Sequence, residues 1–415
     1  MTSAIVLGAG IVGVSTALQL SKRGVSVALV DRRGPGEETS HGNAGIIQSE
    51  AVEPYSMPRD VPSLARIVLG RTNDVRYRLA ALPSHIVALA HYWRNSEPAR
   101  FALICKAYGA LIAYAIPEHD GLIREAGIDN LVRRDGYLLI HRHADQFEQA
   151  IENARRLSQR WGVPHRVLDE SAVRACEPSV VGPVIGAIHW TGPWSVSDPG
   201  RLVKAYAELF ARSGGSMLIG DARSLTRVGR FWRVTTAAGP IEAEHAVVAL
   251  GPWSPELLKR FGYNFRMVRM RGYHRHFAGG APLAHPLFDT ENGYVLAPMT
   301  RGLRITTGAE LTGRDTPATP VQLERAERAA RQLIDLGSSV DPEPWFGTRP
   351  FLADMLPVIG EAIPEYPGLW FNFGHGHQGF TLGPASGRLL AEMVVGSAPV
   401  IDPTPFRPRR ETMHH

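Results

Sequence analysis

The chain has 415 residues, which is long enough for two domains with separate cores. Hydrophobic residues make up 44% and charged residues 20%, proportions typical of a globular protein, so a disordered or fibrous chain is excluded. The net charge of +5 arises from 45 basic and 40 acidic residues that are interspersed along the chain, which argues against nucleic-acid binding.

Cysteine content and apolar runs limit the compartment and the kind of site. Cys105 and Cys176 form no CxxC pair, so we expect neither a disulfide framework nor a bound metal. The apolar stretch at residues 4–20 follows no Lys or Arg and contains several glycines, which predicts a buried strand and helix rather than a signal peptide. No other segment approaches about 18 uninterrupted apolar residues, so we expect no transmembrane segment. These features favour a cytoplasmic protein, with peripheral attachment to the inner membrane as the alternative.

In chain order, the first predicted elements form a β-α-β unit. A short apolar strand at residues 4–8 precedes a helical pattern that Gly24 ends, and a second buried strand follows at residues 25–31. The Gly-, Ser- and Asn-rich stretch at residues 32–45 is predicted to be a loop. Residues 76–130 then have a predominantly helical pattern.

The middle of the chain alternates between strands and helices. A strand at Asp135–His141 precedes a charged helix, and Asp198 with Pro199 has the pattern of an N-cap followed by the first helical residue. The segments that follow, up to about residue 311, are rich in β-branched and aromatic residues with Gly or Pro breaks, which is typical of antiparallel sheet. A helix near 320–336, an apolar strand LWFNFG and a final helix from about Thr381 complete the prediction.

The sequence GAGIVG places Gly8, Gly10 and Gly13 between the first predicted strand and helix. The first glycine permits a tight turn, the second lets the backbone approach a pyrophosphate, and the third allows close helix–strand packing. Asp31 ends the second strand, where a carboxylate accepts hydrogen bonds from a ribose 2′-OH, which argues against NADP. The spacing therefore predicts a dinucleotide site and leaves FAD and NAD open.

Four segments resemble the D-amino acid oxidase superfamily, in particular the bacterial D-amino acid dehydrogenases. They are TSHGNAGII at Thr39–Ile47, AVVALGPWS at Ala246–Ser254, GTRPFLADMLPVIG at Gly347–Gly360 and NFGHGHQGFTLGPASGRLLAEMV at Asn372–Val394. The resemblance keeps its order over most of the chain and implies FAD as the cofactor.

The resemblance also implies the fold and its division. We expect an α/β protein in which a Rossmann-type FAD-binding domain is interleaved with an α+β substrate domain built on a mostly antiparallel sheet. The expected FAD-binding segments are residues 1–75, 165–255 and 340–415, and the expected substrate-binding segments are residues 76–164 and 256–339.

Three residues carry the catalytic roles that the resemblance implies. Arg349, in the G-x-R-P segment, would hold a substrate carboxylate in a bidentate fork, and a structural ion pair is the alternative. Tyr273 would line the substrate cavity, although an ordinary sheet tyrosine fits the sequence equally well. His377 would face the pocket through its side chain without acting as a base.

The expected cofactor contacts lie in the glycine turn, in the loops around the acidic residue and before the final helix. They are Gly8, Gly10, Ile11, Val12, Gly13, Asp31, Arg32, Arg33, Ser40, His41, Asn43, Ala44, Gly45, Ile46, Ala222, Gly251, Trp253, Arg349, Gly374, His375, Gly376, His377, Gln378, Gly379 and Thr381. Some related amine dehydrogenases attach FAD through a histidine, but alignment on Ala44-Gly45 puts that position at Gly42 rather than His41. We therefore expect non-covalent FAD.

These features predict oxidation of an amino acid Cα–N bond to the imine by hydride transfer to flavin. The favoured substrates are D-proline and hydroxylated D-proline. The alternatives are a sarcosine-, glycine- or opine-type amine oxidase, a non-catalytic FAD-binding electron-transfer subunit, and a plain NAD-dependent dehydrogenase. The expected partners are a small amino acid and an electron acceptor, which is a quinone, oxygen or a partner protein; a homo-oligomer is compatible with the sequence.

Overall fold

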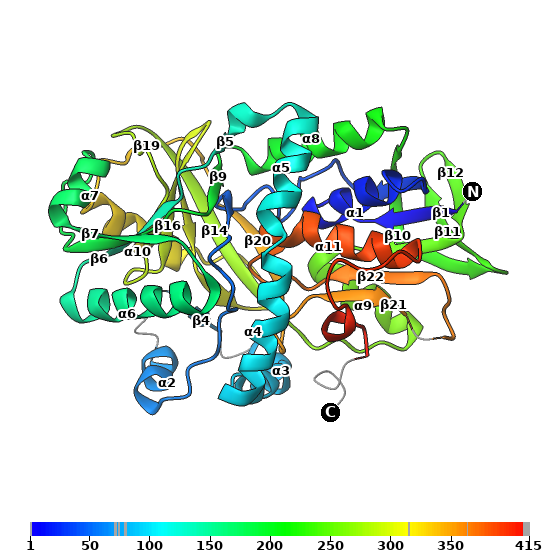
Figure 1. Ribbon diagram of the computed structural model, residues 1–415, viewed down its shortest axis with the longest axis horizontal. Coiled ribbons are helices and arrows are strands. Elements are labelled where there is room, and N and C mark those ends of the chain that lie inside the picture. Colours follow the sequence, from blue (N-terminus) through cyan, green and yellow to red (C-terminus); the bar gives the residue numbers. More distant parts are fainter. Residues whose placement is uncertain are drawn as a thin grey trace.

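Two large sheets lie at opposite ends of the long axis of the molecule (Figure 1). The computed structural model describes residues 2–69, 73, 75–78, 81–313, 316–362 and 364–409. A small three-stranded sheet of β3 (Ile46–Ile47), β9 (Trp194–Val196) and β5 (Val132–Arg133) pairs segments that are far apart in the sequence.

The first sheet is built on the predicted β-α-β unit. Strand β1 (Ser3–Leu7) leads through the glycine turn into α1 (Ile11–Ser21), and β2 (Ser26–Asp31) then pairs with β1 in parallel. The eight strands run in the order β12-β11-β10-β2-β1-β13-β22-β21, and the central strands β10, β2, β1, β13 and β22 are parallel. The further strands are β10 (Ser216–Val228), β11 (Phe231–Thr236), β12 (Gly239–Ala243), β13 (His245–Val248), β21 (Val358–Glu361) and β22 (Leu369–Phe373).

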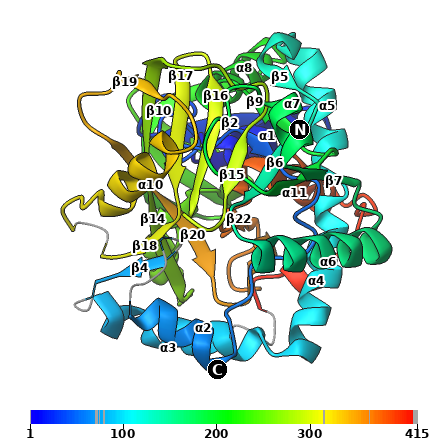
Figure 2. The ribbon, with the colours of Figure 1, turned by 90° about the vertical axis from the view of Figure 1, so that its left-hand side faces the viewer.

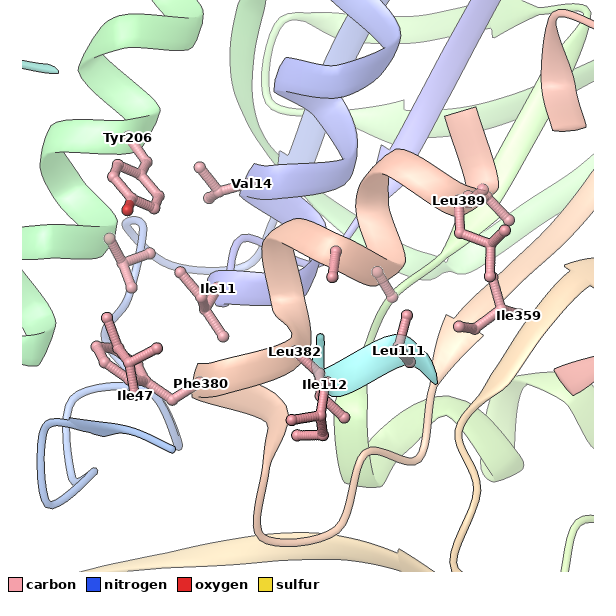
Figure 3. Close-up of a cluster of buried hydrophobic side chains, with 14 of the residues drawn as sticks. Ile11, Val14, Ile47, Leu111, Ile112, Tyr206, Ile359, Phe380, Leu382 and Leu389 are labelled. Atoms are coloured by element: carbon pink, nitrogen blue, oxygen red, sulfur yellow. The ribbon is translucent and has the colours of Figure 1, made fainter. Parts of the chain in front are cut away.

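Helix α11 (Gly379–Val394), at the end of the chain, packs on α1 near its start (Figure 3). The contact is close because α11 carries glycine where the helices meet: a Cβ at Gly387 would lie 2.9 Å from the carbonyl carbon of Ser15. Ile11 and Val14 of α1 and Leu382 of α11 belong to one buried apolar cluster. The last helix therefore completes the nucleotide-binding unit that the first residues begin.

The second sheet has eleven strands and is mostly antiparallel, as predicted. Its path runs β4-β18-β14-β17-β16-β15-β6-β8-β7, with β19 and β20 also paired to β14; among the described residues, β15–β6 and β18–β4 are its only parallel pairs. Figure 2 shows this sheet toward the viewer, with α10 (Val321–Arg331) packed on it. The strands are β4 (Val75–Tyr77), β6 (Tyr137–His141), β7 (His165–Asp169), β8 (Gly186–Trp190), β14 (Met267–Gly279), β15 (Leu287–Asp289), β16 (Tyr294–Met299), β17 (Gly302–Thr307), β18 (Ala309–Leu311), β19 (Gly337–Ser339) and β20 (Trp345–Leu352).

Some strands pair with strands that the sequence assigned to the other domain. The predicted domain boundaries stay a prediction in all other respects. Strands β7 and β8 fall in the segment 165–255 assigned to the FAD-binding domain, yet β8 pairs with β6 in the second sheet. Strand β20 falls in the segment 340–415, yet it pairs with β14. Both differences arise because the residue pattern of a short strand predicts the strand itself but not the sheet in which it will pair.

The remaining helices pack on the sheets or on other helices. They are α2 (Val61–Val68), α3 (Leu82–Asn95), α4 (Pro98–Ile112), α5 (Ala115–Ala126), α6 (Ala144–Trp161), α7 (Glu170–Cys176), α8 (Pro199–Arg212) and α9 (Ser254–Leu258). The predicted N-cap of α8 is confirmed, because the Asp198 side chain accepts a hydrogen bond from the Arg201 backbone N–H.

One helical run has the length and composition of a membrane span, although the sequence predicts no transmembrane segment. Within the described residues, Pro98–Ala126, which contains α4 and α5, is long and apolar enough to cross a membrane by length and composition. A packed core helix passes the same test. Leu111 and Ile112 of this run are buried, and the run packs against α11 (Figure 3).

Candidate active site

A cavity of about 1980 Å³ extends from the glycine turn after β1 to the substrate side of the second sheet. Its wall includes Gly8 and Asp31 at one end, the loop 374–379 before α11, and Arg349 on β20. The predicted nucleotide residues and the predicted carboxylate-binding residue therefore line one continuous space.

The glycine turn has the geometry that a bound pyrophosphate requires. Gly8 has φ +107°, and a Cβ there would lie 2.5 Å from the Ala249 carbonyl oxygen. A Cβ at Gly13 would lie 1.8 Å from the Gly8 carbonyl oxygen, so this glycine serves helix–strand packing and does not line the cavity. Gly10 lines the cavity and leaves the start of α1 open to it.

The acidic residue after β2 is held beside this turn. Asp31 accepts hydrogen bonds from the backbone N–H groups of Ala9 (2.7 Å) and Arg33 (2.9 Å). The Arg32 guanidinium lies 4.7 Å from the ring centre of Trp253, and both residues line the cavity. The turn, the carboxylate and this stacked pair form a cradle that fits the adenosine end of a dinucleotide.

The loop before α11 forms the other part of the cradle. Gly374 (φ +85°) and Gly376 (φ +58°) adopt left-handed backbone conformations that favour glycine, and the Gly376 N–H donates to the Pro350 carbonyl at 2.9 Å. Burial lowers the pKa of His375 to about 3, and its Nε2 is hydrogen-bonded to Ser386 Oγ at 3.0 Å. His375 is therefore a neutral structural residue that ties the loop to the helix.

Arg349 is the partly buried cation of the substrate side. Its Nη1 donates to the Gly308 carbonyl at 2.6 Å and its Nη2 to the Thr307 carbonyl at 3.0 Å. Burial lowers its pKa to about 10, and no carboxylate among the described residues forms an ion pair with it. A partly buried guanidinium without an anion is poorly compensated, so the site favours a negatively charged ligand. Within the part of the chain that the structure describes, Arg349 does not form the structural ion pair that the sequence left open.

His377 stands next to Arg349 on the cavity wall. Burial and the nearby Arg349 charge lower the pKa of His377 to about 3, so the ring is neutral at physiological pH. The Tyr55 ring meets it edge-on at 5.5 Å between ring centres, and Phe351 lies at 6.1 Å. These three rings make an apolar wall beside the cation, in keeping with the expectation that His377 is not a base.

The prediction that Tyr273 lines the substrate cavity is wrong. Its side chain is fully buried on the opposite face of β14, where its hydroxyl donates to Glu310 Oε2 at 2.6 Å. The neighbouring Met270 and Gly272 line the cavity instead. Side chains alternate between the two faces of a strand, and Tyr273 points to the face of the sheet on which α10 packs.

Most of the other expected cofactor contacts line the cavity, and their contacts with the cofactor stay predictions. The residues on the wall are Gly8, Gly10, Ile11, Val12, Asp31, Arg32, Ser40, Asn43, Ala44, Ile46, Ala222, Gly251, Trp253, Gly374, His375, Gly376, Gln378 and Gly379. The residues away from the wall are Gly13, Arg33, His41, Gly45 and Thr381.

The side chain of His41 does not line the cavity. Its ring is 6.0 Å from that of His274 and 6.2 Å from that of Trp345, and burial lowers its pKa. Gly42, the position that aligns with the attachment histidine of some relatives, lines the cavity but has no side chain for attachment. This placement supports the expectation of non-covalent FAD.

Sequence reasoning missed Gly272 and several polar residues on the wall, among them Gln48, Glu50, Tyr55 and Asn372. Gln48 and Glu50 follow the TSHGNAGII segment, but an ordinary loop sequence gives no sign that a carboxyl group will be buried there. Gln378 Nε2 donates to Gln48 Oε1 at 2.6 Å, which links the loop before α11 to this segment.

The fold and the cavity define a flavin-dependent oxidoreductase. The family model "FAD dependent oxidoreductase" (DAO) matches residues 3–393. The chain is 31% identical to a D-amino acid dehydrogenase of Chromohalobacter salexigens over 96% of this chain and 97% of the relative. It is 30% identical to a D-amino acid dehydrogenase of Granulibacter bethesdensis, again over 96% and 97%.

Solved structures agree in fold. Glycine oxidase from Geobacillus kaustophilus matches with a TM-score of 0.72 and 22% identity, over 99% of this chain and 98% of that one. Iminodiacetate oxidase from Chelativorans matches with a TM-score of 0.71 and 22% identity, over 98% of each chain.

The chain belongs to the DAO family of FAD-dependent oxidoreductases, and its cofactor is FAD. The fold class, the family and the cofactor predicted from the sequence are thereby confirmed, and a plain NAD-dependent dehydrogenase is set aside.

Proposed function

We propose that this enzyme oxidises the Cα–N bond of a D-amino acid to the imine, with D-proline or a hydroxylated D-proline as the substrate. The observation that carries the proposal is the partly buried Arg349 guanidinium on the wall of the cavity, which has no carboxylate partner among the described residues. Curated relatives named D-amino acid dehydrogenase, similar over nearly the whole chain, support the substrate class.

FAD, when bound, supplies the two-electron acceptor of this chemistry. Arg349 holds the substrate carboxylate through its planar fork and thereby fixes which face of the α-carbon is presented. Orientation of this kind is worth about 7 to 11 kcal/mol in favourable cases, so much of the rate depends on this residue. The imine then hydrolyses in water to a keto acid, or stays cyclic if the substrate is a ring amine.

The walls near Arg349 suit a compact apolar ring. Tyr55, Phe351 and His377 surround the cation with aromatic surface, and His377 is neutral. A five-membered ring can bury its apolar surface against these side chains, and the Arg349 guanidinium can pair with the negative charge of its carboxylate.

The test is anaerobic reduction of the bound flavin by a panel of D-amino acids, L-amino acids and N-methyl amino acids. Bleaching by D-proline with no effect of L-proline supports the proposal, and bleaching by sarcosine or glycine alone contradicts it. Turnover of the isolated chain with an artificial acceptor distinguishes an enzyme from an electron-transfer subunit.

Arg349→Ala supplies the second measurement. We expect kcat/KM for carboxylate-bearing amines to fall by at least about 30-fold, because loss of one partner of a buried charge pair costs about 2–5 kcal/mol. An unchanged kcat/KM would rule out the carboxylate clamp.

A further inference from the structure

A buried carboxyl group that neither the cofactor cradle nor the Arg349 clamp uses lies on the same cavity wall. Glu50 is 6% exposed and lines the cavity. Its Oε1 accepts hydrogen bonds from Gln48 Nε2 (2.7 Å) and from the Tyr137 hydroxyl (2.9 Å). Its Oε2 is itself buried and has no hydrogen-bond partner among the described residues. One oxygen is thus fixed by the protein, and the other lacks a donor.

The surroundings of Glu50 supply no positive charge. The titratable groups that face it are tyrosines: Tyr137 on β6 and Tyr108 on α4. No Lys, Arg or His among the described residues forms an ion pair with it. Burial raises the pKa of Glu50 to about 7, as expected for a carboxyl group whose charged form has no counter-ion.

A hydrogen-bonded chain holds this carboxyl group relative to the loop before α11. Thr381 Oγ1 donates to Gln378 Oε1 (2.7 Å), Gln378 Nε2 donates to Gln48 Oε1 (2.6 Å), and Gln48 Nε2 donates to Glu50. Such a chain fixes the direction of the carboxyl group, which a solvated surface glutamate does not need.

Glu50 and Arg349 lie in connected parts of the cavity. Tyr55 packs on His377 beside Arg349, and it also lies close enough to Tyr108 and Tyr137 to influence their pKa values. The cavity therefore offers a cation at one place and a carboxyl group at another, with Tyr55 near Arg349 and near Tyr137, which donates to Glu50. This is the charge arrangement that complements a zwitterion.

We propose that Glu50 binds an ammonium group of the substrate, as the acidic counterpart of the Arg349 clamp. The inference rests on the proposed function, which supplies an amine as substrate. Ammonium N–H groups provide both the donor that Oε2 lacks and the missing positive charge. Two sources share this chemistry: the reacting α-amine, and a second amine at the far end of a basic side chain.

The test measures ligand binding by calorimetry to holoenzyme whose flavin has been reduced beforehand, so that no turnover occurs. The ligands are D-proline, D-ornithine and tetrahydro-2-furoate, which has the ring and carboxylate of proline but no amine. The variant Glu50→Gln keeps the shape and an oxygen for the Tyr137 hydroxyl, and it removes the charge. Glu53→Gln is the matched control, because Glu53 already pairs with Arg156 at 2.7 Å.

We expect Glu50→Gln to weaken amine binding by about 10- to 100-fold and to leave tetrahydro-2-furoate unchanged, since hydrogen bonds to charged groups have this magnitude. Weakened D-proline binding identifies the α-amine as the source, and weakening confined to D-ornithine identifies a distal amine. Equal weakening of tetrahydro-2-furoate, or no weakening of any ligand, overturns the proposal.

A second measurement needs no variant. Wild-type affinity for the amine ligands should fall as pH decreases through about 7, because the protonated carboxyl group no longer pairs with ammonium. Tetrahydro-2-furoate affinity should not follow this profile, and identical profiles for the two ligand types would contradict the role of Glu50. If the wild-type enzyme binds tetrahydro-2-furoate but no amino acid, this result contradicts the proposed function itself. Binding of both with no effect of Glu50→Gln contradicts only the inference.

Discussion

Gly272 on β14 lies directly against the guanidinium of Arg349 on β20: a Cβ added to Gly272 would lie 2.7 Å from Nη2 and 2.8 Å from Cζ. Because Gly272 has no side chain, β14 leaves room for the guanidinium of Arg349 on the paired strand β20. Both residues line the cavity, so the space that Gly272 leaves open is part of the proposed carboxylate clamp.

Gly272→Ala should therefore impair substrate binding while the protein stays folded. The methyl group would displace the guanidinium, and we expect kcat/KM to fall by about 10- to 100-fold, since small misplacements of positioning groups have such effects. The control is Gly121→Ala in α5, where a Cβ would meet nothing within 4 Å. Steady-state kinetics of the two variants check the prediction, and a Gly272→Ala enzyme with normal kinetics would show that the clamp tolerates displacement.

Gly8→Ala should prevent retention of FAD. The residue has φ +107° and its Cβ would collide with the Ala249 carbonyl at 2.5 Å, so the turn cannot keep its shape. Gly24→Ala is the control, because Gly24 also has positive φ (+79°) but open space around it. The ratio of flavin absorbance to protein absorbance after purification measures the effect; a yellow Gly8→Ala protein with full occupancy would contradict it.

Tyr273→Phe should lower stability and leave substrate kinetics nearly unchanged. The hydroxyl donates to the buried Glu310 and accepts from the Thr319 N–H at 2.9 Å, so its loss leaves buried polar groups unsatisfied. We expect a loss of about 1–3 kcal/mol in the free energy of unfolding. Denaturant unfolding and steady-state kinetics test both parts, and a large rise in KM with unchanged stability would restore Tyr273 to the substrate site.

The unliganded protein should lose stability as pH rises from about 4.5 to above 7 through the contribution of Glu50. Burial raises its pKa in the folded state to about 7, so the folded protein binds this proton more tightly than the unfolded chain does. The stabilisation is complete below pH 4.5 and is lost as pH rises through 7, with a magnitude of at most about 3 kcal/mol.

Comparison of wild type with Glu50→Gln isolates this contribution, because the amide does not titrate. The difference in free energy of unfolding between the two proteins should change with pH over that interval. Glu53→Gln should show the opposite sign and at lower pH, below about 4.5, because hydrogen bonds from Arg156 and Trp161 outweigh burial and lower the pKa of Glu53. A pH-independent difference for Glu50→Gln would show that its carboxyl group is not buried in solution.

The sequence alone determined the features that short-range geometry encodes. The spacing of Gly8, Gly10 and Gly13 between an apolar strand and a helix predicts the turn, because only glycine tolerates the positive φ and the close backbone contacts found there. Asp198 and Pro199 likewise predict the start of α8, because capping needs only neighbouring residues.

Only the tertiary structure decided which residues meet in the cavity. Gly272 and Tyr273 are neighbours in sequence, yet one lies against Arg349 and the other bonds Glu310 on the opposite face of the sheet. The burial of Glu50 depends on Tyr137 from β6, and the placement of β8 and β20 depends on partners elsewhere in the chain. These contacts join residues distant in sequence, whose free energy of interaction exists only once the two sheets have formed, so no local pattern records them.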